Sequence, residues 1–321
     1  MYCIYPDKGS SELAKHVGGY IRKKRLDITE DMSKAGIIFA VGNDNTILNA
    51  FRDLGKREIP VLGIASGQSF LAQSDVNSFE NHVDLISRGK FNIFKRARIV
   101  AKISGVYYSA LNDIGIFPSK SASLMRYNLN INNELLWKDN ADGLIVATPT
   151  GSTGYSYSAH GPIILDEPKV LSITPISSIE KKSSLILPSN SEIFVDNIQA
   201  NKPIAIMDGD ARISLKSDSV EIKKSKYDAC FVQFSREYAI EDKLKKRTAT
   251  FRREKTKNLP ASAKLVYQTL SYEGNLTQKE IINLTFLPER TVRHALEILL
   301  RKELITVKPY LNDARQSVYG V

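Results

Sequence analysis

The sequence has few of the residues that usually carry covalent or metal chemistry. It holds two cysteines, Cys3 and Cys230, and four scattered histidines. Two cysteines make neither a disulfide framework nor a metal cluster, and the histidine spacing matches no zinc motif. The sequence also lacks an apolar run of about 18 residues and a signal-peptide start. We therefore expect a cytoplasmic protein with no membrane partner and no bound metal.

Positive charge is in excess and is unevenly placed. The net charge is +10, and residues 243–321 carry 16 Lys and Arg against 7 Asp and Glu. A basic terminal region is typical of proteins that bind polyanions, nucleic acid first. A basic segment without any partner is the alternative.

The first 95 residues alternate between short apolar runs and helical patterns. Residues 36–41 and 59–64 predict buried strands, and each is followed by a loop of small and polar residues. Alternating strands and helices indicate a parallel sheet with ligands at its carboxyl edge. We expect residues 1–95 to form an α/β domain.

Residues 96–246 have a different pattern. Short β-prone runs are separated by turn residues such as Asn132 and Asn133, which predicts an all-β sandwich domain, with a return segment at its end. Residues 247–258 are basic and poor in apolar residues, so they predict an exposed linker.

Residues 259–321 predict three helices followed by a hairpin. Thr277 is a plausible N-cap for the second helix, and residues 292–299 place apolar side chains on one face of the third. This order resembles winged helix-turn-helix transcription regulators. A small helical dimerisation unit is the alternative. The resemblance implies double-stranded DNA as partner, with these contact residues: Arg290, Thr291, Arg293, His294, Arg301, Lys302, Lys308 and Arg315.

A hydroxyl-rich loop at residues 148–162, TPTGSTGYSYSAHGP, follows a predicted buried strand at 143–147. Gly151 and Gly154 allow the backbone to turn and to approach a ligand closely. The hydroxyls and free backbone amides offer hydrogen bonds without charge, which suits a sugar, an amide or a phosphate. A Ser- and Gly-rich surface loop is the bland alternative.

Residues 1–246 resemble the NAD kinase family in the order of their motifs. The family's GGDGT loop corresponds to residues 42–46, its Asn-Glu pair to Asn112-Asp113, and its Ala-Asp-Gly and TPTGSTAY segments to residues 141–155. Met207-Asp208-Gly209 supplies the last element. The resemblance implies an NAD kinase-like fold, an α/β domain and a β-sandwich, with a dinucleotide bound between them.

The resemblance also implies the functional residues. Asp44 would face the ribose hydroxyl that receives phosphate, and would orient it or take its proton. Asp142 and Asp208 could instead be ordinary turn residues. The residues implied to bind NAD or NADP are Asn112, Asp113, Asp142, Thr148, Ser152, Thr153, Tyr155, Ser158 and Asp208.

Departures from the family pattern gather in the phosphate-donor half. Asn43 and Asn45 replace two glycines of the GGDGT loop, and their side chains would occupy the space for ATP phosphates. The segments 65–71 and 174–178 also lack the family's Asn and Pro-His. We therefore expect an NAD(P)-responsive DNA-binding transcription regulator that forms a homodimer or higher oligomer. The alternative is an active NAD kinase that uses ATP and Mg²⁺ and carries an appended DNA-binding domain.

Overall fold

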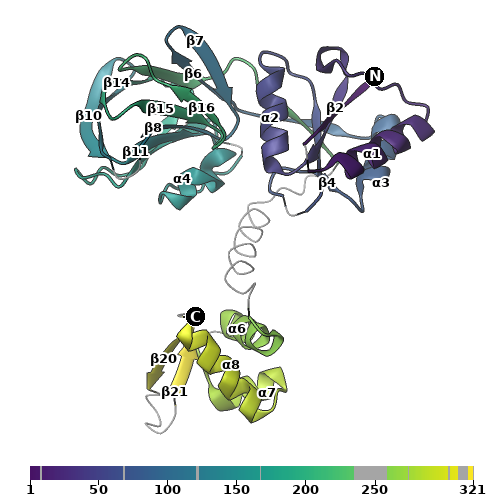
Figure 1. Cartoon of the computed structure of the whole chain (residues 1–321), viewed down its shortest axis with the longest axis vertical. Helices are drawn as coiled ribbons and strands as arrows, with labels where there is room; N and C mark the ends of the chain where they lie inside the picture. The colour runs from purple at the N-terminus through teal and green to yellow at the C-terminus, as the bar shows by residue number, and fades with distance from the viewer. Residues whose placement is uncertain are drawn as a thin grey trace. The chain divides into compact units, whose positions relative to one another are not determined.

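The computed structural model describes residues 1–7, 9–67, 69–120, 123–166, 168–234, 259–273, 275–302, 304–309 and 317–320 (Figure 1). The chain divides into two compact units, Met1–Ile240 and Glu241–Val321. None of the helices among the described residues has the length and apolar character needed to span a lipid bilayer.

The first unit begins with an α/β domain, as the alternating pattern predicts. Its sheet has the order β1-β2-β3-β18-β5, with β4 paired to β3. All pairs are parallel except β18 with β5. The elements are β1 (Tyr2–Pro6), α1 (Ser11–Lys23), η1 (Met32–Lys34), β2 (Ile37–Gly42), α2 (Asp44–Leu54), β3 (Val61–Ala65), β4 (Ser74–Asp75), α3 (Phe79–Ser87), β5 (Asn92–Arg96) and β18 (Ala229–Gln233).

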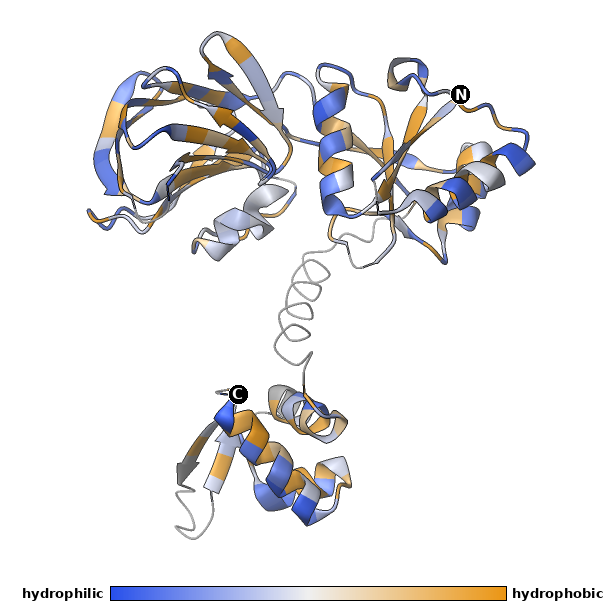
Figure 2. Cartoon of the chain, in the orientation of Figure 1, coloured by the Kyte–Doolittle hydropathy of each residue, from blue (hydrophilic) through white to orange (hydrophobic). Residues whose placement is uncertain are grey.

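Helices cover both faces of this sheet. Every residue of β2 and β3 is buried, which explains why these strands are continuous apolar runs. Ile38 and Ala40 of β2 pack in the cluster that contains α2, whereas Phe39 and Val41 pack in the cluster that contains α1 and α3. Figure 2 shows hydrophobic and hydrophilic stripes alternating along α1 and α2. The helices are therefore held by burial of one face each.

Strand β18 comes from the far end of the unit. It inserts between β3 and β5, so the chain leaves the α/β domain after β5 and returns to complete its sheet. The predicted boundary near residue 95 coincides with the end of β5. The return segment that was expected at the end of residues 96–246 thus becomes a strand of the first sheet.

The intervening residues form a β-sandwich of two antiparallel six-stranded sheets. Their orders are β10-β9-β14-β17-β6-β7 and β13-β12-β11-β8-β15-β16. One hydrophobic cluster, which includes Tyr127, Leu129, Val146 and Ile173, fills the space between them. The elements are β6 (Ile99–Ile103), β7 (Val106–Ala110), β8 (Asp113–Pro118), β9 (Met125–Ile131), β10 (Glu134–Ala141), β11 (Gly143–Ala147), η2 (Gly151–Thr153), α4 (Tyr155–Ser158), β12 (Val170–Ile176), β13 (Leu185–Pro188), β14 (Ile193–Gln199), β15 (Pro203–Met207), β16 (Ala211–Ser214) and β17 (Val220–Lys224).

A buried arginine joins the α/β domain to the sandwich. Arg98 is 1% exposed, and its guanidinium donates to the carbonyls of Phe51 and Tyr227, each at 3.0 Å. Phe51 lies in α2, so Arg98 ties this helix to the strands of the sandwich. This anchor sets the position of α2 beside the site described below.

In its described residues, the second unit contains three helices and a three-stranded sheet of order β19-β21-β20. As predicted, Thr277 is the N-cap of α7: it accepts a hydrogen bond from the Glu280 amide at 3.3 Å, and the Glu280 carboxylate accepts one from the Thr277 amide at 2.7 Å. The elements are α6 (Ala261–Glu273), β19 (Leu276–Thr277), α7 (Gln278–Thr285), α8 (Glu289–Arg301), β20 (Thr306–Pro309) and β21 (Ser317–Gly320). The predicted linker at 247–258 lies outside the described residues.

Candidate active site

The hydroxyl-rich loop is tied to the start of β8. Thr148 is fully buried, and its hydroxyl donates to the Leu111 carbonyl at 2.6 Å while its amide donates to the Asn112 carbonyl at 2.9 Å. The Gly151 amide in turn donates to the Thr148 hydroxyl at 3.1 Å. A Cβ atom on Gly151 would overlap the backbone of Asn112, so only glycine fits there.

Ser152 has an internal role in this loop. It is fully buried, its hydroxyl donates to the Pro149 carbonyl at 2.7 Å, and it accepts from the Ile164 amide at 2.9 Å. Both Thr148 and Ser152 therefore use their hydroxyls to hold the loop in shape. The two residues were predicted to bind a dinucleotide, and they can contribute to that only through the loop backbone that they position.

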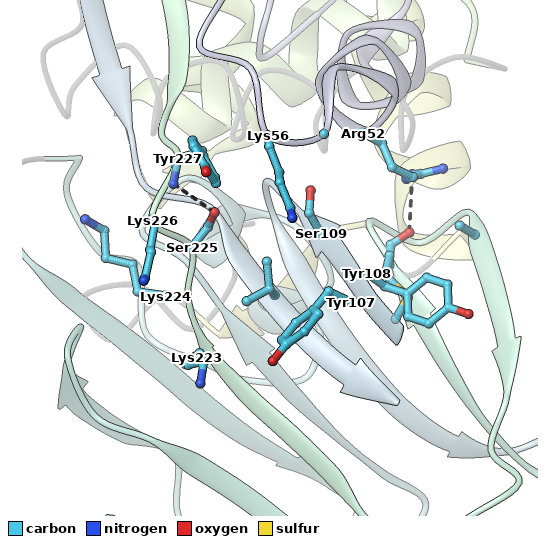
Figure 3. A pocket seen from close by; sticks show the side chains of 14 residues that line it. Arg52, Lys56, Tyr107, Tyr108, Ser109, Lys223, Lys224, Ser225, Lys226 and Tyr227 are labelled. Atoms are coloured by element: carbon cyan, nitrogen blue, oxygen red, sulfur yellow. Dashed lines mark hydrogen bonds between the residues drawn. The ribbon is translucent and has the colours of Figure 1, made fainter. Parts of the chain in front are cut away.

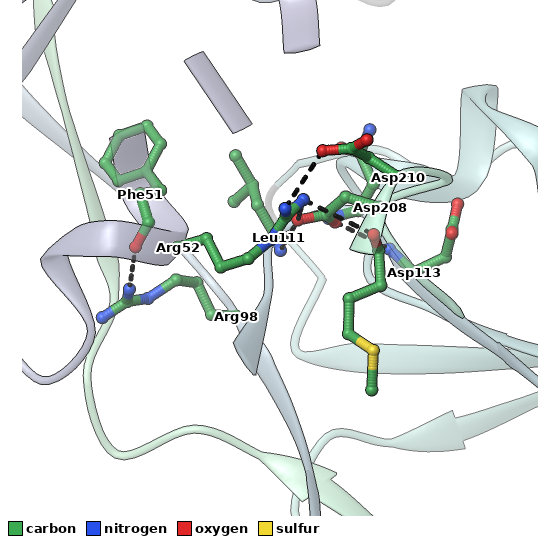
Figure 4. Close-up of polar contacts among 9 residues, drawn as sticks. Phe51, Arg52, Arg98, Leu111, Asp113, Asp208 and Asp210 are labelled. Atoms are coloured by element: carbon green, nitrogen blue, oxygen red, sulfur yellow. Dashed lines mark hydrogen bonds and ion pairs between the residues drawn. The ribbon is translucent and has the colours of Figure 1, made fainter. Parts of the chain in front are cut away.

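Two buried carboxyl groups meet where this loop joins β8. Asp208 is 7% exposed and accepts from the amides of Leu111 at 3.2 Å, Asn112 at 2.7 Å and Asp113 at 3.4 Å (Figure 4). Burial raises the pKa of Asp208 to about 6, although the amides and Arg52 oppose the shift. Burial, and then the neighbouring Asp208, raise the pKa of Asp113 to about 7. Both carboxyl groups therefore keep their protons to a higher pH than an exposed aspartate does.

Arg52 supplies the nearest positive charge to this pair. Its guanidinium lies 3.8 Å from the Asp208 carboxylate and 3.2 Å from that of Asp210, and it also donates to the Met207 carbonyl at 3.5 Å. Figure 4 shows Arg52 reaching from α2 across to the Asp208 turn. The α/β domain thus contributes directly to the electrostatics of the sandwich site.

A pocket of about 260 Å³ opens beside Asp113. Asp113 is 5% exposed, and no described residue donates a hydrogen bond to its carboxyl group. The Oδ1 atom of Asn112 is likewise buried without a partner in the described part of the chain. Buried polar atoms normally have partners, so these two groups are suited to a ligand that donates hydrogen bonds.

Aromatic rings form one wall of the same pocket. The rings of Phe117 and Tyr155 stack with centroids 5.8 Å apart, and Tyr155 is 47% exposed. A Cβ on Gly115 or Gly143 would overlap the Phe117 ring, so these glycines make room for it. An exposed aromatic face next to hydrogen-bonding groups is suited to a planar base.

The other residues predicted to bind a dinucleotide are placed unevenly. Thr153 is half-buried in η2 and Ser158 is exposed at the end of α4, both in the segment that carries Tyr155. Asp142 is exposed at the opposite end of β11 from Thr148, about 20 Å away along the strand. A single chain therefore does not bring Asp142 to the other residues.

Asp44 is the first residue of α2 and is firmly positioned. Its carboxylate accepts from the amides of Phe70 and Leu71, at 3.0 Å each in their shortest contacts, and from the Ser69 hydroxyl. Most of these hydrogen bonds go to Oδ1, so Oδ2 can still accept a hydrogen bond from a ligand. Residues 69–71, which follow β3 in the chain, thus orient Asp44 at the carboxyl edge of the parallel sheet.

Asn43 behaves differently from the sequence-based expectation. Its φ is −96°, so this position does not require a left-handed backbone, and its side chain turns back to accept from the Thr46 amide at 3.2 Å. Asn43 is the N-cap of α2, a position that Asn favours. Its side chain is therefore committed to the helix, and the replacement of glycine here is not by itself a sign of a lost phosphate site.

The residues predicted to contact DNA belong to the second unit. Arg290, Thr291, Arg293 and His294 lie on α8, Arg301 ends it, Lys302 follows it, Lys308 lies in β20, and Arg315 lies outside the described residues. Arg293 pairs with Glu289 at 2.7 Å and Arg301 with Glu297 at 3.0 Å. These two arginines are thus partnered within their own helix.

Sequence reasoning missed two residues of the site. Arg52 acts on Asp208 from 156 positions away, and no local pattern signals such a contact. Phe117 could have been found from the sequence, because Asp113, Gly115 and Phe117 are alternate residues of β8 and therefore lie on the same face of the sheet. Among the described residues, no group of three or more His, Cys, Asp or Glu side chains could hold a metal ion.

Comparisons with known proteins agree with this architecture. Residues 8–91 match the ATP-NAD kinase N-terminal domain, and residues 111–234 match the ATP-NAD kinase C-terminal domain. The NAD kinase of Methanopyrus kandleri is 30% identical over 225 residues, which cover 69% of this chain and 80% of the relative. The NAD kinase of Clostridium kluyveri is 33% identical over 222 residues, which cover 66% of this chain and 78% of the relative.

Solved structures share the fold of the first unit. An NAD kinase from Archaeoglobus fulgidus in complex with ATP has a TM-score of 0.68 at 23% identity, covering 78% of this chain and 99% of that chain. Yeast NADH kinase in complex with NADH has a TM-score of 0.69 at 20% identity, covering 76% and 86%. The predicted fold of an α/β domain followed by a β-sandwich is confirmed.

These findings contradict the expected regulator. The relatives are named NAD kinase, which favours the enzyme, and the prediction of a DNA-binding transcription regulator with a degenerate donor loop is wrong. The family matches end at residue 234, and none of these comparisons shows a winged helix-turn-helix domain or a DNA partner. The physical reason is that the Asn43 side chain caps α2, so the glycine replaced at this position is not by itself a sign of a lost phosphate site.

Proposed function

The chain belongs to the NAD kinase family, and on that premise we propose that it transfers the γ-phosphate of ATP to the ribose 2′-hydroxyl of NAD. The observation that carries the proposal is the pocket beside Asp113. There the buried Asp113 carboxyl group lies next to an aromatic wall and accepts no hydrogen bond from a described residue. The Oδ1 atom of the preceding residue, Asn112, is also buried without a partner in the described part of the chain. These groups are suited to the hydroxyls and base of a nucleotide.

In this proposal the dinucleotide is held from three sides. Asp113 and Asn112 accept hydrogen bonds from ribose hydroxyls or amide groups, and Tyr155 stacks on a planar ring. Thr148 and Ser152 hold the loop that presents backbone amides. Asp208 orients the turn that carries Asn112 and Asp113 through its three amide contacts. Thr153 and Ser158 stay predicted contacts of the same ligand.

Asp44 is the proposed base for phosphoryl transfer. The 2′-oxygen attacks the γ-phosphorus, its proton passes to Asp44, and the bond from the γ-phosphorus to the β,γ-bridging oxygen breaks to release ADP. The contacts of Asp44 with residues 69–71 hold its carboxylate in one orientation, and positioning is the main contribution a protein makes to this reaction. Mg²⁺ is expected as part of the ATP substrate.

The direct test is product formation by the purified full chain. Incubation with ATP, Mg²⁺ and NAD should yield NADP and ADP in equal amounts, measured by chromatography. A chain that binds NAD but forms no NADP above a no-enzyme control would contradict the kinase proposal. Parallel reactions with NADH identify the preferred acceptor, which the sequence does not decide.

Three expectations remain predictions beside this function. They are the homo-oligomeric state, the role of Asp142, which one chain leaves apart from the site, and the identity of the second unit beyond its described helices and sheet. In an oligomer, Asp142 of one copy could lie at the Asp113 pocket of another copy. Asp142 would then contact the dinucleotide as predicted.

A further inference from the structure

A second and larger pocket lies at the other end of α2. It has a volume of about 690 Å³ and is formed by the end of α2 and by strands β6, β7 and β17 (Figure 3). A helix rises 1.5 Å per residue, so this end of the 11-residue α2 is about 15 Å from Asp44. Figure 1 shows β7 and α4 at opposite edges of the sandwich, so the pocket is also separate from the Tyr155 site.

The lining of this pocket is strongly basic. Arg52, Lys56, Lys223, Lys224 and Lys226 line it, and none of the described lining residues is acidic. Lys223 pairs with Glu221 at 2.5 Å and Lys224 with Asp228 at 3.6 Å, both outside the lining.

Two of these cations have no counter-charge among the described residues. Within the described part of the chain, neither Lys56 nor Lys226 pairs with a carboxylate, and both are exposed. Figure 3 shows Lys56 extending from the end of α2 over the strands that carry Ser109 and Tyr107. Like charges gathered in a concave site raise the local concentration of anions. An anionic ligand would therefore be attracted to this pocket.

A hydroxyl inside the pocket also lacks a partner. The Oγ atom of Ser109 is buried and makes no hydrogen bond with any described residue. Buried polar atoms are normally satisfied, and one that is not indicates a missing water, ion or ligand. Because Ser109 lies beside the Lys56 side chain in Figure 3, an anion bound by the lysine could also accept from this hydroxyl.

Exposed tyrosines complete the lining. Tyr107 is 55% exposed and Tyr227 is 38% exposed, and both line the pocket. Aromatic faces beside positive charge are the combination by which proteins bind bases and phosphates together. A site for simple inorganic ions would need the lysines alone.

We propose that this pocket is a second ligand site that binds a nucleotide, with phosphates on Lys56, Lys226 and Ser109 and the base on Tyr107 or Tyr227. The site goes beyond the proposed kinase function, because its lining residues other than Arg52, which pairs with Asp208, have no part in holding NAD or acting on the phosphate. The volume lies within the usual range for small-molecule sites.

Calorimetric titration of the full chain with ADP tests the proposal. The variant Lys56→Ala/Lys226→Ala should lose one class of ADP sites, or bind it at least about 10-fold more weakly. The matched control Lys15→Ala/Lys90→Ala removes two exposed lysines elsewhere on the same unit and should bind like the original chain. Unchanged stoichiometry and affinity in the first variant would overturn the site. This comparison holds whether or not the chain makes NADP.

A second titration separates charge from base recognition. Tripolyphosphate should bind this class of sites about 5- to 100-fold more weakly than ADP, since it cannot stack. The variant Tyr107→Ala/Tyr227→Ala should bind ADP only as tightly as the original chain binds tripolyphosphate. Equal binding of both probes to the original chain would overturn the nucleotide assignment. Tighter binding of a single-stranded oligonucleotide than of ADP, lost in the lysine variant, would overturn it in favour of nucleic acid.

Discussion

The guanidinium of Arg52 lies 3.8 Å from the carboxylate of Asp208, across the boundary between the α/β domain and the β-sandwich. Asp208 is 7% exposed and holds the turn at residues 111–113 through three amide contacts. The position of α2 is therefore coupled electrostatically to the turn that presents Asn112 and Asp113. Asp44 begins the same helix, so one element positions both halves of the proposed reaction.

Replacing Arg52 with Met should destabilise the first unit. The change leaves Asp208 buried without its nearest cation, which should cost about 1–3 kcal/mol at about pH 8. The cost should shrink at about pH 5, because Asp208, with a pKa raised to about 6, is then protonated. Urea titration followed through Trp137, the single tryptophan and a residue of the sandwich, measures both values. Arg52→Lys keeps the charge and is the control; an equal loss at both pH values would refute the electrostatic explanation.

Replacing Asp44 with Asn should abolish most turnover. Asn keeps an oxygen that can accept from the residue 70 and 71 amides, but it cannot take the proton of the 2′-hydroxyl. NADP formation should fall about 10²- to 10⁴-fold, while the affinity for NAD stays within about 2-fold. The nearby change Asn45→Gly restores the family's glycine and should leave turnover at least as high. Full activity in Asp44→Asn would remove Asp44 from the mechanism.

Replacing Asp113 with Asn should change how stability depends on pH. The pKa of Asp113 is near 4 in the unfolded chain and is raised to about 7 in the folded one. Between about pH 4 and pH 7 the Asp113 carboxyl group is protonated in the folded state but ionised in the unfolded state. The contribution of this protonation to the free energy of unfolding is therefore complete below about pH 4 and is lost as the pH rises through 7.

The Asp113→Asn variant should therefore be more stable than the original chain at about pH 8, and its stability should lose the part of the pH dependence that Asp113 contributes. Urea titration at several pH values measures it. Asp142→Asn removes an exposed carboxyl from the same domain and should leave this pH dependence intact. If the original chain is as stable at about pH 8 as at about pH 5, burial does not raise the pKa of Asp113 as described.

Replacing Gly151 with Ala should disrupt the loop. The added methyl would overlap the backbone of Asn112, so the loop must shift, at a cost of about 1–3 kcal/mol and with weaker NAD binding. Gly19→Ala is the control, because the same methyl meets open space there, inside helix α1. That change should stabilise by about 0.5–1 kcal/mol. Thermal unfolding and NAD titration measure both; a tolerated Gly151→Ala would contradict the close approach.

Much of the fold can be predicted from local residue patterns and from the order of the motifs along the chain. Buried strands such as 36–41 and 59–64 are visible because a parallel sheet covered on both faces needs continuous apolar runs. The TPTGSTGY loop and the Asn112-Asp113 pair are visible because their order along the chain resembles that of the NAD kinase family. Those features were sufficient for the fold of the first unit, and the site residues taken from them stay predictions.

Contacts between distant segments decided the rest. The insertion of β18 between β3 and β5, the approach of Arg52 to Asp208 and the raised pKa values of Asp113 and Asp208 depend on which buried groups meet in space. Asn43 shows the same limit, because a side chain that could have blocked phosphates is committed to capping α2. The type of a residue determines which hydrogen bonds and charges its side chain can form. Its burial and its neighbours determine which of these it does form, and they exist only once the chain has folded.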